Sequence, residues 1–573
     1  MILPAPIGLG VVLIAGCAVH PRLAAGDAAP PTAAATASPP AATALRTPAE
    51  RAQFHVMAGE LAAGRGLPKP AAEQFLQALA LAPDAKLAAR ATELALAAKD
   101  SELAQRAAHT WLAAQPDSLE AREVLIRLAL VRADTQQAFE QSRAIIDRHP
   151  GGIDDGFHLV ALLLAQNLSD ADTALALIGR LAAAYSHASS AWRAQALVAL
   201  HFKRYRDAES AAQHALQLEP DSVDAGMMLT AARVQLGDLA GADAAVRTLA
   251  QGARAHDVQL AYARLLLSAD HSEHARGVLQ RVLSRSPRDE DARFMLALLE
   301  LSENHLDAAQ RQFSQLHQSD AHGQEAEYYL GRIAELQRQP QMALQHYRRV
   351  TAGAKALDAS LRRALVLGQL GRVDQARTIF DQLDEQYPPL AAHFAAAEAQ
   401  MLLGAKRPTD AAQVLEQALQ QSPDDPELLY GRALAYEKLG RVADAESDLH
   451  RIVGHDPNDA QALNALGYMM TIHGGDYAQA REFIEKANLL SPNDPAIMDS
   501  LGWVIYRQGD ADTAVGWLRK AYALQPEAEI ATHLGKALGA LGDVAGAQRV
   551  LKQALARDPG NAQLREALDQ LRK

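Results

Sequence analysis

The chain has little of what disulfide-stabilised, metal-binding or nucleic-acid-binding proteins require. Only one of its 573 residues is a cysteine, Cys17, so neither an intramolecular disulfide nor a paired-cysteine metal or redox site is possible. It has 56 basic and 68 acidic residues, a formal net charge of -12, and no basic stripe that would displace counterions from phosphates. We therefore expect no nucleic-acid partner.

Motifs that would indicate catalysis are also missing. The sequence has no Walker pattern and no GxGxxG stretch between a strand and a helix, so it offers no phosphate-binding loop. None of its 20 histidines belongs to an HExxH zinc motif, and no serine or cysteine lies in a nucleophile motif. We expect a protein that is not an enzyme, with no cofactor, no metal site and no small-molecule substrate.

What the sequence does contain is a helical repeat. Alanine and leucine dominate it, and beyond the N-terminus no stretch alternates Val, Ile and Thr as a strand would. One alanine recurs every 33 to 36 residues, and the fourteen steps from first to last cover 476 residues, a mean of 34.0. Its positions are Ala71, Ala104, Ala138, Ala174, Ala208, Ala242, Ala275, Ala309, Ala343, Ala376, Ala411, Ala445, Ala480, Ala514 and Ala547. This period predicts an all-α fold of fifteen repeated units.

Three further markers divide each unit into two helices. A proline follows the alanine by twelve residues in most units, as at Pro83 and Pro457, and stops the second helix. A glycine such as Gly440 closes the first helix. An Asp or Asn after the proline, as in Pro457-Asn458-Asp459, is typical of the N-cap of the next helix. Four units lack the proline, and there we expect an irregular superhelix: those of Ala174, Ala242, Ala309 and Ala343.

The N-terminus resembles the signal of a bacterial lipoprotein. Residues 7–16 form an apolar run that is too short to span a bilayer but typical of a secretory signal. The run ends in Ile14-Ala15-Gly16-Cys17, which is similar to the lipobox of that family. The resemblance implies that the peptide bond before Cys17 is cut and that the cysteine is acylated, which anchors the protein to a membrane through lipid alone.

Two observations qualify this interpretation. Ala18 and Val19 follow Cys17, and the lack of Asp at these positions favours the outer membrane by resemblance to enterobacterial sorting. No Lys or Arg precedes the apolar run, which departs from the family pattern. A misassigned start codon, or an α-amine that alone supplies the positive charge, would explain this departure. The alternatives to a lipoprotein signal are a generic cleaved signal and an apolar N-terminus without such a role.

The segment after Cys17 differs in composition from the repeats. Residues 17–48 are mostly Ala, Pro, Thr and Ser and bury too little surface to fold, so we expect a disordered tether. At about 3.1 Å per residue it reaches roughly 90 Å when extended. The predicted division is a signal peptide at 1–16, the lipidated cysteine and tether at 17–48, repeats at 49–560 and a final helix at 561–573.

The period, the alanine and the proline together resemble the tetratricopeptide repeat, a helix-turn-helix unit of 34 residues. In that family small residues occupy the eighth, twentieth and twenty-seventh positions, and proline lies near the thirty-second. The resemblance covers about residues 50–573 and implies a right-handed superhelical solenoid of about 15 helical hairpins that binds proteins. The last hairpin of a solenoid has no neighbour, so residues 561–573 are expected to form a capping helix with a polar outer face.

The family resemblance also implies a binding groove lined by the first helix of each repeat. The register that places Gly467 and Gly502 at position 8 predicts six groove residues: Asn464, Tyr468, Asp499, Trp503, Tyr506 and Arg507. Aromatic and arginine side chains are favoured in binding hot spots, and only 5% of this chain is aromatic. The set therefore predicts a partner-binding site. The alternative is that Trp503 and Tyr506 only pack between neighbouring hairpins.

One region goes beyond the repeat pattern, from Ala462-Leu-Asn-Ala-Leu-Gly-Tyr through Ile484-Glu-Lys-Ala to Ser491-Pro-Asn-Asp-Pro-Ala-Ile-Met-Asp-Ser-Leu-Gly-Trp. It resembles large proteobacterial lipoproteins that bind periplasmic carboxyl-terminal processing proteases. The resemblance implies an adaptor on the periplasmic face of the outer membrane that recruits the protease and its peptidoglycan hydrolase substrates. The alternative is an assembly scaffold or pilotin of an envelope machine that exports a pilus or polysaccharide. An enzyme would need a compact non-repeating domain, for which the repeats leave no room.

Overall fold

The computed structural model describes residues 47–251 and 254–571. These residues form 31 α-helices and one short 3₁₀ helix, η1 (Pro388–Leu390), and within them there is no strand. The all-α repeat solenoid expected from the sequence is confirmed. No helix in the described ranges has the length and apolarity needed to cross a membrane. The expected signal peptide, Ile14, Ala15, Gly16, Cys17 and the tether up to residue 46 lie outside the described residues.

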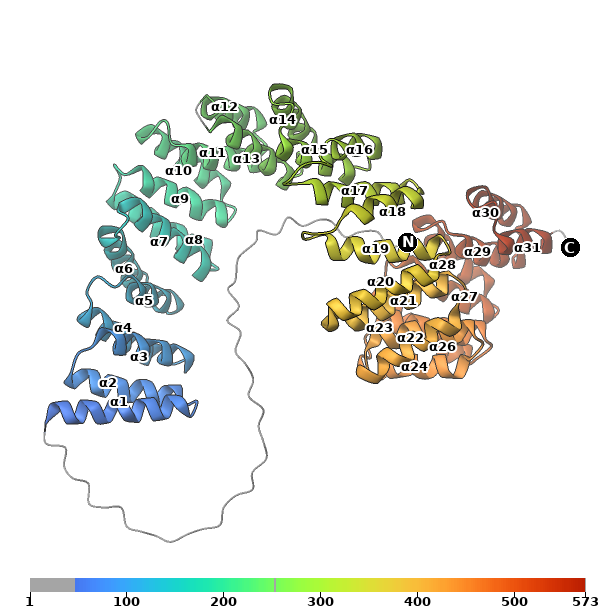
Figure 1. Cartoon of the computed structure of the whole chain (residues 1–573), viewed down its shortest axis with the longest axis horizontal. Coiled ribbons are helices and arrows are strands. Elements are labelled where there is room, and N and C mark those ends of the chain that lie inside the picture. The colour runs from blue at the N-terminus through green and yellow to red at the C-terminus, as the bar shows by residue number, and fades with distance from the viewer. Residues whose placement is uncertain (1–46, 252–253, 572–573) are drawn as a thin grey trace, which may run out of the picture. The chain divides into compact units, whose positions relative to one another are not determined.

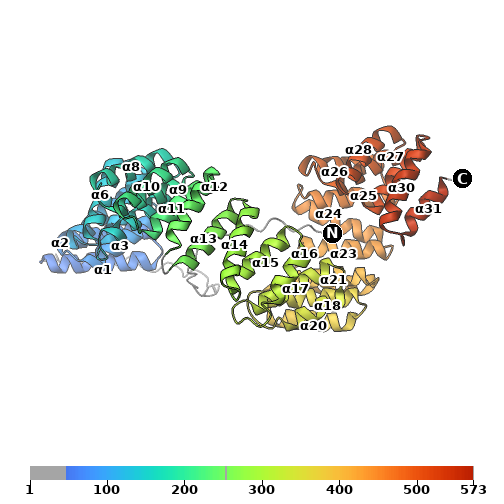
Figure 2. The same cartoon turned by 90° about the horizontal axis from the view of Figure 1, so that it is seen from above.

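The helices are arranged as successive hairpins, an odd-numbered helix followed by an even-numbered one, and α31 comes last. The chain divides into two compact units, the first ending at Leu299 and the second beginning at Glu300, within α15. In each unit a hairpin lies against the next one along the chain, as Figure 1 and Figure 2 show. Neighbours in sequence are therefore neighbours in space, which is the arrangement of a repeat protein.

The helices of the first unit are α1 (Pro48–Gly64), α2 (Pro68–Leu81), α3 (Ala85–Ala97), α4 (Ser101–Ala114), α5 (Leu119–Val131), α6 (Thr135–Arg148), α7 (Ile153–Asn167), α8 (Ala171–Ala184), α9 (Ser189–His201), α10 (Tyr205–Leu218), α11 (Val223–Leu236), α12 (Leu239–Leu249), α13 (Ala255–Ser268), α14 (Ser272–Arg285) and most of α15 (Glu290–Ser302).

Those of the second unit are α16 (Leu306–Ser314), α17 (Gly323–Leu336), α18 (Pro340–Arg349), α19 (Ala356–Gln369), α20 (Val373–Gln386), α21 (Ala391–Gly404), α22 (Pro408–Gln421), α23 (Pro426–Lys438), α24 (Val442–His455), α25 (Ala460–Ile472), α26 (Tyr477–Leu490), α27 (Pro495–Arg507), α28 (Ala511–Leu524), α29 (Ala528–Ala540), α30 (Val544–Arg557) and α31 (Ala562–Gln570).

The recurring alanine holds each hairpin together. It is the fourth residue of every even-numbered helix from α2 to α30, and in all fifteen cases its exposed fraction is 0%. The partner on the first helix is often a glycine. At Gly467 a Cβ atom would lie 2.6 Å from the carbonyl oxygen of Ala480, so only glycine lets α25 and α26 approach this closely. The small residues of the pattern therefore set the distance between the two helices.

The turn inside every hairpin except α7–α8 takes one residue in the left-handed region. Gly440 and Gly542 do so with φ values of 74° and 81°, as the sequence pattern predicts. In other hairpins a non-glycine residue takes this conformation, for example Lys99 and Ala133, each with φ 56°. The predicted N-cap Asp459 is confirmed, because its side chain accepts the backbone N–H of Ala462.

Three of the four hairpins without the proline differ from the others in the length of their second helix. Their second helices are short: α12 has 11 residues, α16 has 9 and α18 has 10. The second helices that are followed by the proline each have 14 residues, as in α22 and α24. The fourth hairpin without it is the exception, because α8 also has 14 residues.

The last helix covers the end of the second unit. Asn561 caps α31 by accepting the backbone N–H of Leu564. Leu564 and Ala567 are buried and pack with Leu551 and Ala554 of α30. Most of the remaining residues of α31 are polar, and all of them are exposed or only partly buried. This is the arrangement that a solenoid end requires, because the last hairpin would otherwise leave its apolar face in water.

Candidate protein-binding groove

The six residues predicted to line a groove lie on two neighbouring first helices. Asn464 and Tyr468 are on α25, whereas Asp499, Trp503, Tyr506 and Arg507 are on α27. Helices α25, α27 and α29 pack side by side in the second unit. The predicted residues are therefore brought close to each other, and they meet at a side chain of α29 that the sequence pattern had not singled out.

That side chain is His533. Its ring stacks on the indole of Trp503, with the centroids 4.1 Å apart and the planes at 14°. Its Nδ1 lies 2.9 Å from Oδ2 of Asp499. The ring of Tyr468 is also near, tilted by 52° and with its centroid 6.3 Å from that of the imidazole. His533 thus connects three repeats, and it directly follows Thr532, which lies one repeat after Asp499.

The centre of this group is shielded from water. The exposed fraction is 5% for Asp499 and 7% for both Trp503 and His533. Burial raises the pKa of the Asp499 carboxyl, and the hydrogen bond with His533 offsets part of that rise. Oδ1 of Asp499, Nε1 of Trp503 and Oδ1 of Asn464 have no hydrogen-bond partner among the described residues. Trp503 therefore offers little surface to a partner and mainly supports its neighbours.

The remaining predicted residues are partly exposed. Tyr506 stacks on Trp503, with ring centroids 5.1 Å apart. The guanidinium of Arg507 lies 5.1 Å from the ring centroid of Tyr477 and donates to its hydroxyl. The Tyr468 hydroxyl donates to Glu529 of α29. Tyr468 and Tyr506 therefore retain surface that a partner can contact, while Arg507 is engaged with the preceding helix, α26.

A pocket of about 220 Å³ opens beside this group. It is formed by α25, α29 and the capping helix α31, and its lining residues are Tyr468, Glu529, Thr532, His533, Lys536, Gln563, Glu566, Ala567 and Gln570. In the text below we call it the α31 pocket. Of the residues predicted from the sequence, only Tyr468 lines it.

Three residues that line the α31 pocket and were not predicted, Glu529, Thr532 and Lys536, follow the same register. Trp503 comes directly after Gly502 and Tyr468 directly after Gly467; Lys536 likewise comes directly after Gly535. Extending the register by one repeat would also have placed Glu529 and Thr532 on the groove side. His533 has no such signal, because it lies between two groove positions and its role depends on how α27 and α29 pack.

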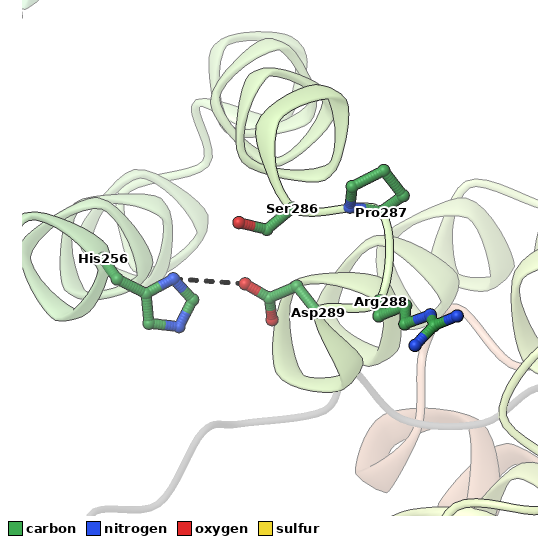
Figure 3. Close-up of a pocket in the computed structure, with 5 residues that line it drawn as sticks. All are labelled: His256, Ser286, Pro287, Arg288 and Asp289. Atoms are coloured by element: carbon green, nitrogen blue, oxygen red, sulfur yellow. Dashed lines mark ion pairs between the residues drawn. The ribbon is translucent and has the colours of Figure 1, made fainter.

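A second concave feature lies in the first unit, between α13 and the start of α15. Nδ1 of His256 is 3.2 Å from Oδ2 of Asp289, and Ser286 lies beside them (Figure 3). Ser286 is on the Nδ1 side of the imidazole in this view, whereas a serine nucleophile bonds to the other ring nitrogen. Oδ1 of Asp289 accepts the backbone N–H of Ala292. Asp289 therefore caps the start of α15, and the three residues lack the geometry of a catalytic triad.

Comparison with known families and proteins agrees with the repeat architecture. Models of the tetratricopeptide repeat match residues 294–358, 361–426, 402–467, 475–529 and 533–568. Of the six predicted groove residues, Asn464, Asp499, Trp503, Tyr506 and Arg507 lie within these matches, whereas Tyr468 directly follows one of them. The solved TPR protein TTC0263 of Thermus thermophilus is 24% identical, over 32% of this chain and 98% of its own, with a TM-score of 0.30.

Two curated relatives share longer stretches of sequence. TPR repeat-containing protein PA4667 of Pseudomonas aeruginosa is 40% identical over 211 residues, which are 37% of this chain and 36% of that protein. Cellulose synthase 2 operon protein C of Komagataeibacter xylinus is 30% identical over 274 residues, 47% of this chain and 19% of that protein. The chain thus spans about a third of the first relative and about a fifth of the second.

Proposed function

We propose that this tetratricopeptide repeat protein is a membrane-anchored scaffold that binds other proteins, and that it acts as an adaptor for a periplasmic carboxyl-terminal processing protease. The observation that carries the proposal is the gathering of Tyr468, Trp503, Tyr506 and His533 on three adjacent first helices. The buried Trp503 and His533 hold the partly exposed rings of Tyr468 and Tyr506 in place, and rigidly held aromatic surface is what a protein-binding hot spot requires.

The anchor and the tether complete the proposal. A lipid on Cys17 holds the repeats near the outer membrane, on its periplasmic side, and residues 17–48 let them move within that zone. A protease and a cell-wall hydrolase bound to one chain meet at an effective concentration set by the scaffold, which replaces a bimolecular search. The repeat surface is long enough for more than one partner, because each hairpin adds its own face.

The identity of the partner rests on sequence resemblance in the region of α25 to α27. The stretch that resembles protease-binding lipoproteins, from Ala462 to Trp503, is also the stretch that supplies Tyr468, Asp499 and Trp503 to the groove. The stretch that resembles protease-binding lipoproteins in sequence therefore also supplies two of the four rings of the aromatic group in the groove.

A second candidate is an assembly scaffold or pilotin of an envelope machine that exports a pilus or polysaccharide. It is favoured by one observation, the 30% identity over 47% of this chain to a protein named for a cellulose synthase operon. Both candidates need a protein-binding surface and an anchor, so they differ only in the partner.

The test is affinity capture from bacterial envelope extracts with the full-length chain. We expect a periplasmic processing protease together with a peptidoglycan hydrolase. Tyr468→Ala should weaken this capture by at least about 1 kcal/mol, the loss that defines an interface contact of consequence. Tyr205→Ala removes a partly buried tyrosine from α10 in the first unit and serves as the matched control, because it leaves the groove intact.

The same extracts distinguish the alternatives. Capture of a secretin or a polysaccharide synthase in place of the protease would favour the export scaffold. Failure of Cys17→Ala to move the protein out of the membrane fraction would remove the anchor from the proposal, and equal capture by Tyr468→Ala and wild type would remove the groove.

A further inference from the structure

The α31 pocket has the size of a site for one side chain. Its volume of about 220 Å³ is below the roughly 300 to 1,000 Å³ typical of small-molecule sites. It is built from three separate helices, α25, α29 and α31, so its shape depends on the packing of the last repeats. A protein segment that lies along the groove can place a single long side chain in it.

The charges that surround the pocket are mainly negative. Glu529 of α29 and Glu566 of α31 both line it, and Gln570 donates to Glu566 and orients that carboxylate. The buried carboxylate of Asp499 lies 2.9 Å from the imidazole of His533. Among the nine lining residues Lys536 is the only Lys or Arg, and its ammonium lies 5.5 Å from the centroid of Trp503.

The titration behaviour of Tyr468 agrees with a negative local potential. Burial raises the pKa of its phenol, and the negative charges of Glu529, Asp499 and Glu437 raise it further. The ring of Tyr468 also forms a wall of the pocket, and His533 forms another. An aromatic wall next to carboxylates stabilises a cation by two routes, by the ring quadrupole and by direct charge pairing.

We propose that the α31 pocket binds one basic side chain, an arginine or a lysine, from an extended segment of a partner protein, held between Glu529 and Glu566 against the ring of Tyr468. The inference rests on the scaffold function proposed above and adds the chemistry of the partner segment. A carboxylate, including a free chain terminus, is disfavoured, because Lys536 alone would have to outweigh both glutamates.

The interaction can be measured with a chain whose only tryptophan is Trp503. The chain has four tryptophans, and Phe is placed at the other three: Trp111, Trp192 and Trp517. Trp503 reports on the pocket because it stacks on His533 and lies under Lys536. The probes are the peptide amides Ac-Ala-Arg-Ala-NH2, its citrulline analogue, which keeps the shape of arginine without the charge, and Ac-Ala-Glu-Ala-NH2.

We expect the arginine peptide to change the Trp503 emission saturably, with an affinity about tenfold higher than that of the citrulline peptide because charge-assisted pairing is lost in the analogue. The effect should weaken with salt. Equal affinity for the arginine and citrulline peptides, a preference for the glutamate peptide, or no saturable change with arginine would each overturn the proposal.

Two substitutions of opposite sign strengthen the test. Glu529→Gln keeps an acceptor for the Tyr468 hydroxyl but removes a charge, and it should weaken arginine binding about threefold to tenfold. Lys536→Gln removes the opposing cation and should strengthen it. Glu482→Gln, at an exposed position on α26, should leave the affinity unchanged. If the first two changes shift the affinity in the same direction, the charge argument is wrong.

The two proposals, the pocket for a basic side chain and the protease adaptor, can fail independently of each other. A chain that captures the protease but shows no preference for the arginine peptide keeps the adaptor function and refutes the pocket. A chain that prefers the arginine peptide but captures no envelope protein keeps the pocket and refutes the adaptor. Circular dichroism of each variant shows whether the repeats are still folded.

Discussion

The imidazole of His533 lies parallel to the indole of Trp503, with ring centroids 4.1 Å apart. The two residues belong to first helices of successive repeats, α29 and α27. Stacking across that boundary joins the last two hairpins more specifically than the small alanines and leucines of the repeat pattern do. The same imidazole forms a hydrogen bond with Asp499, which offsets part of the free-energy cost of burying that carboxylate. His533 therefore contributes both a stacking contact and a hydrogen bond.

Removing this imidazole should destabilise the end of the second unit. His533→Ala deletes the stacking partner of Trp503 and takes away the hydrogen-bond partner of the buried Asp499 carboxylate, which costs about 3 to 5 kcal/mol in comparable pairs. Urea unfolding followed by tryptophan emission measures the loss. His187→Ala, at an exposed position, should cost little.

A double variant isolates the charge. Adding Asp499→Asn to His533→Ala should restore part of the lost stability, because the amide is cheaper to bury than a carboxylate. If the double variant is less stable than His533→Ala alone, the unpaired charge of Asp499 is not what destabilises the His533→Ala protein.

The stability of the protein should depend on the protonation of Asp499. The pKa of this carboxyl in the folded state lies above its ordinary value of 3.8, with burial as the main cause. Protonation therefore favours the folded state, and the stability gained in this way is present below about pH 3.8 and lost as the pH rises through the folded pKa.

Asp499→Asn tests that sign. Asparagine keeps an oxygen acceptor for His533 but never ionises, so its stability advantage over wild type should be largest at neutral pH and shrink as the pH falls toward 3.8. Urea midpoints of both proteins across this range give the difference. An advantage that grows on acidification would mean that the folded state holds the ionised form of Asp499 more tightly than the unfolded chain does.

Two glycine substitutions in neighbouring repeats should have opposite effects. Gly467→Ala places a Cβ 2.6 Å from the Ala480 carbonyl oxygen and should cost about 1 to 3 kcal/mol, because the backbones of α25 and α26 must separate. Gly516→Ala on α28 meets no atom within 4 Å and should stabilise by roughly 0.5 to 1 kcal/mol through helix propensity. Thermal unfolding of both compares them directly, and a tolerated Gly467→Ala would show that this approach is not tight.

Most of the fold follows from a few positions in the sequence. The alanine of each second helix is buried in all fifteen hairpins, because its small side chain touches the first helix directly. Proline and the capping Asp459 place the boundaries for reasons that are local to the chain. The short helices α12, α16 and α18 occur in hairpins that lack the proline, so at these three places the missing proline coincides with a shortened second helix.

The site was less predictable than the fold. Tyr468 and Trp503 followed from the register of the repeat, and Lys536 was open to the same argument one repeat later. His533 was not, because its contacts depend on the rotation between α27 and α29, which no spacing in the sequence specifies. The depth at which Trp503 is buried has the same origin: a groove position faces the concave side, but the next repeat determines how much of it stays exposed.

The capping helix provides the last prediction. Leu564 is fully buried on α31, so Leu564→Ala should cost about 2 to 5 kcal/mol. Leu489, on α26, is 81% exposed, and Leu489→Ala should change stability by less than about 0.5 kcal/mol. Because a repeat protein is stabilised by contacts between neighbouring units, the damage should spread inward from the end, and hydrogen exchange should accelerate in α29 to α31 before α25. Uniform acceleration along the second unit would instead mean that it unfolds as one cooperative block.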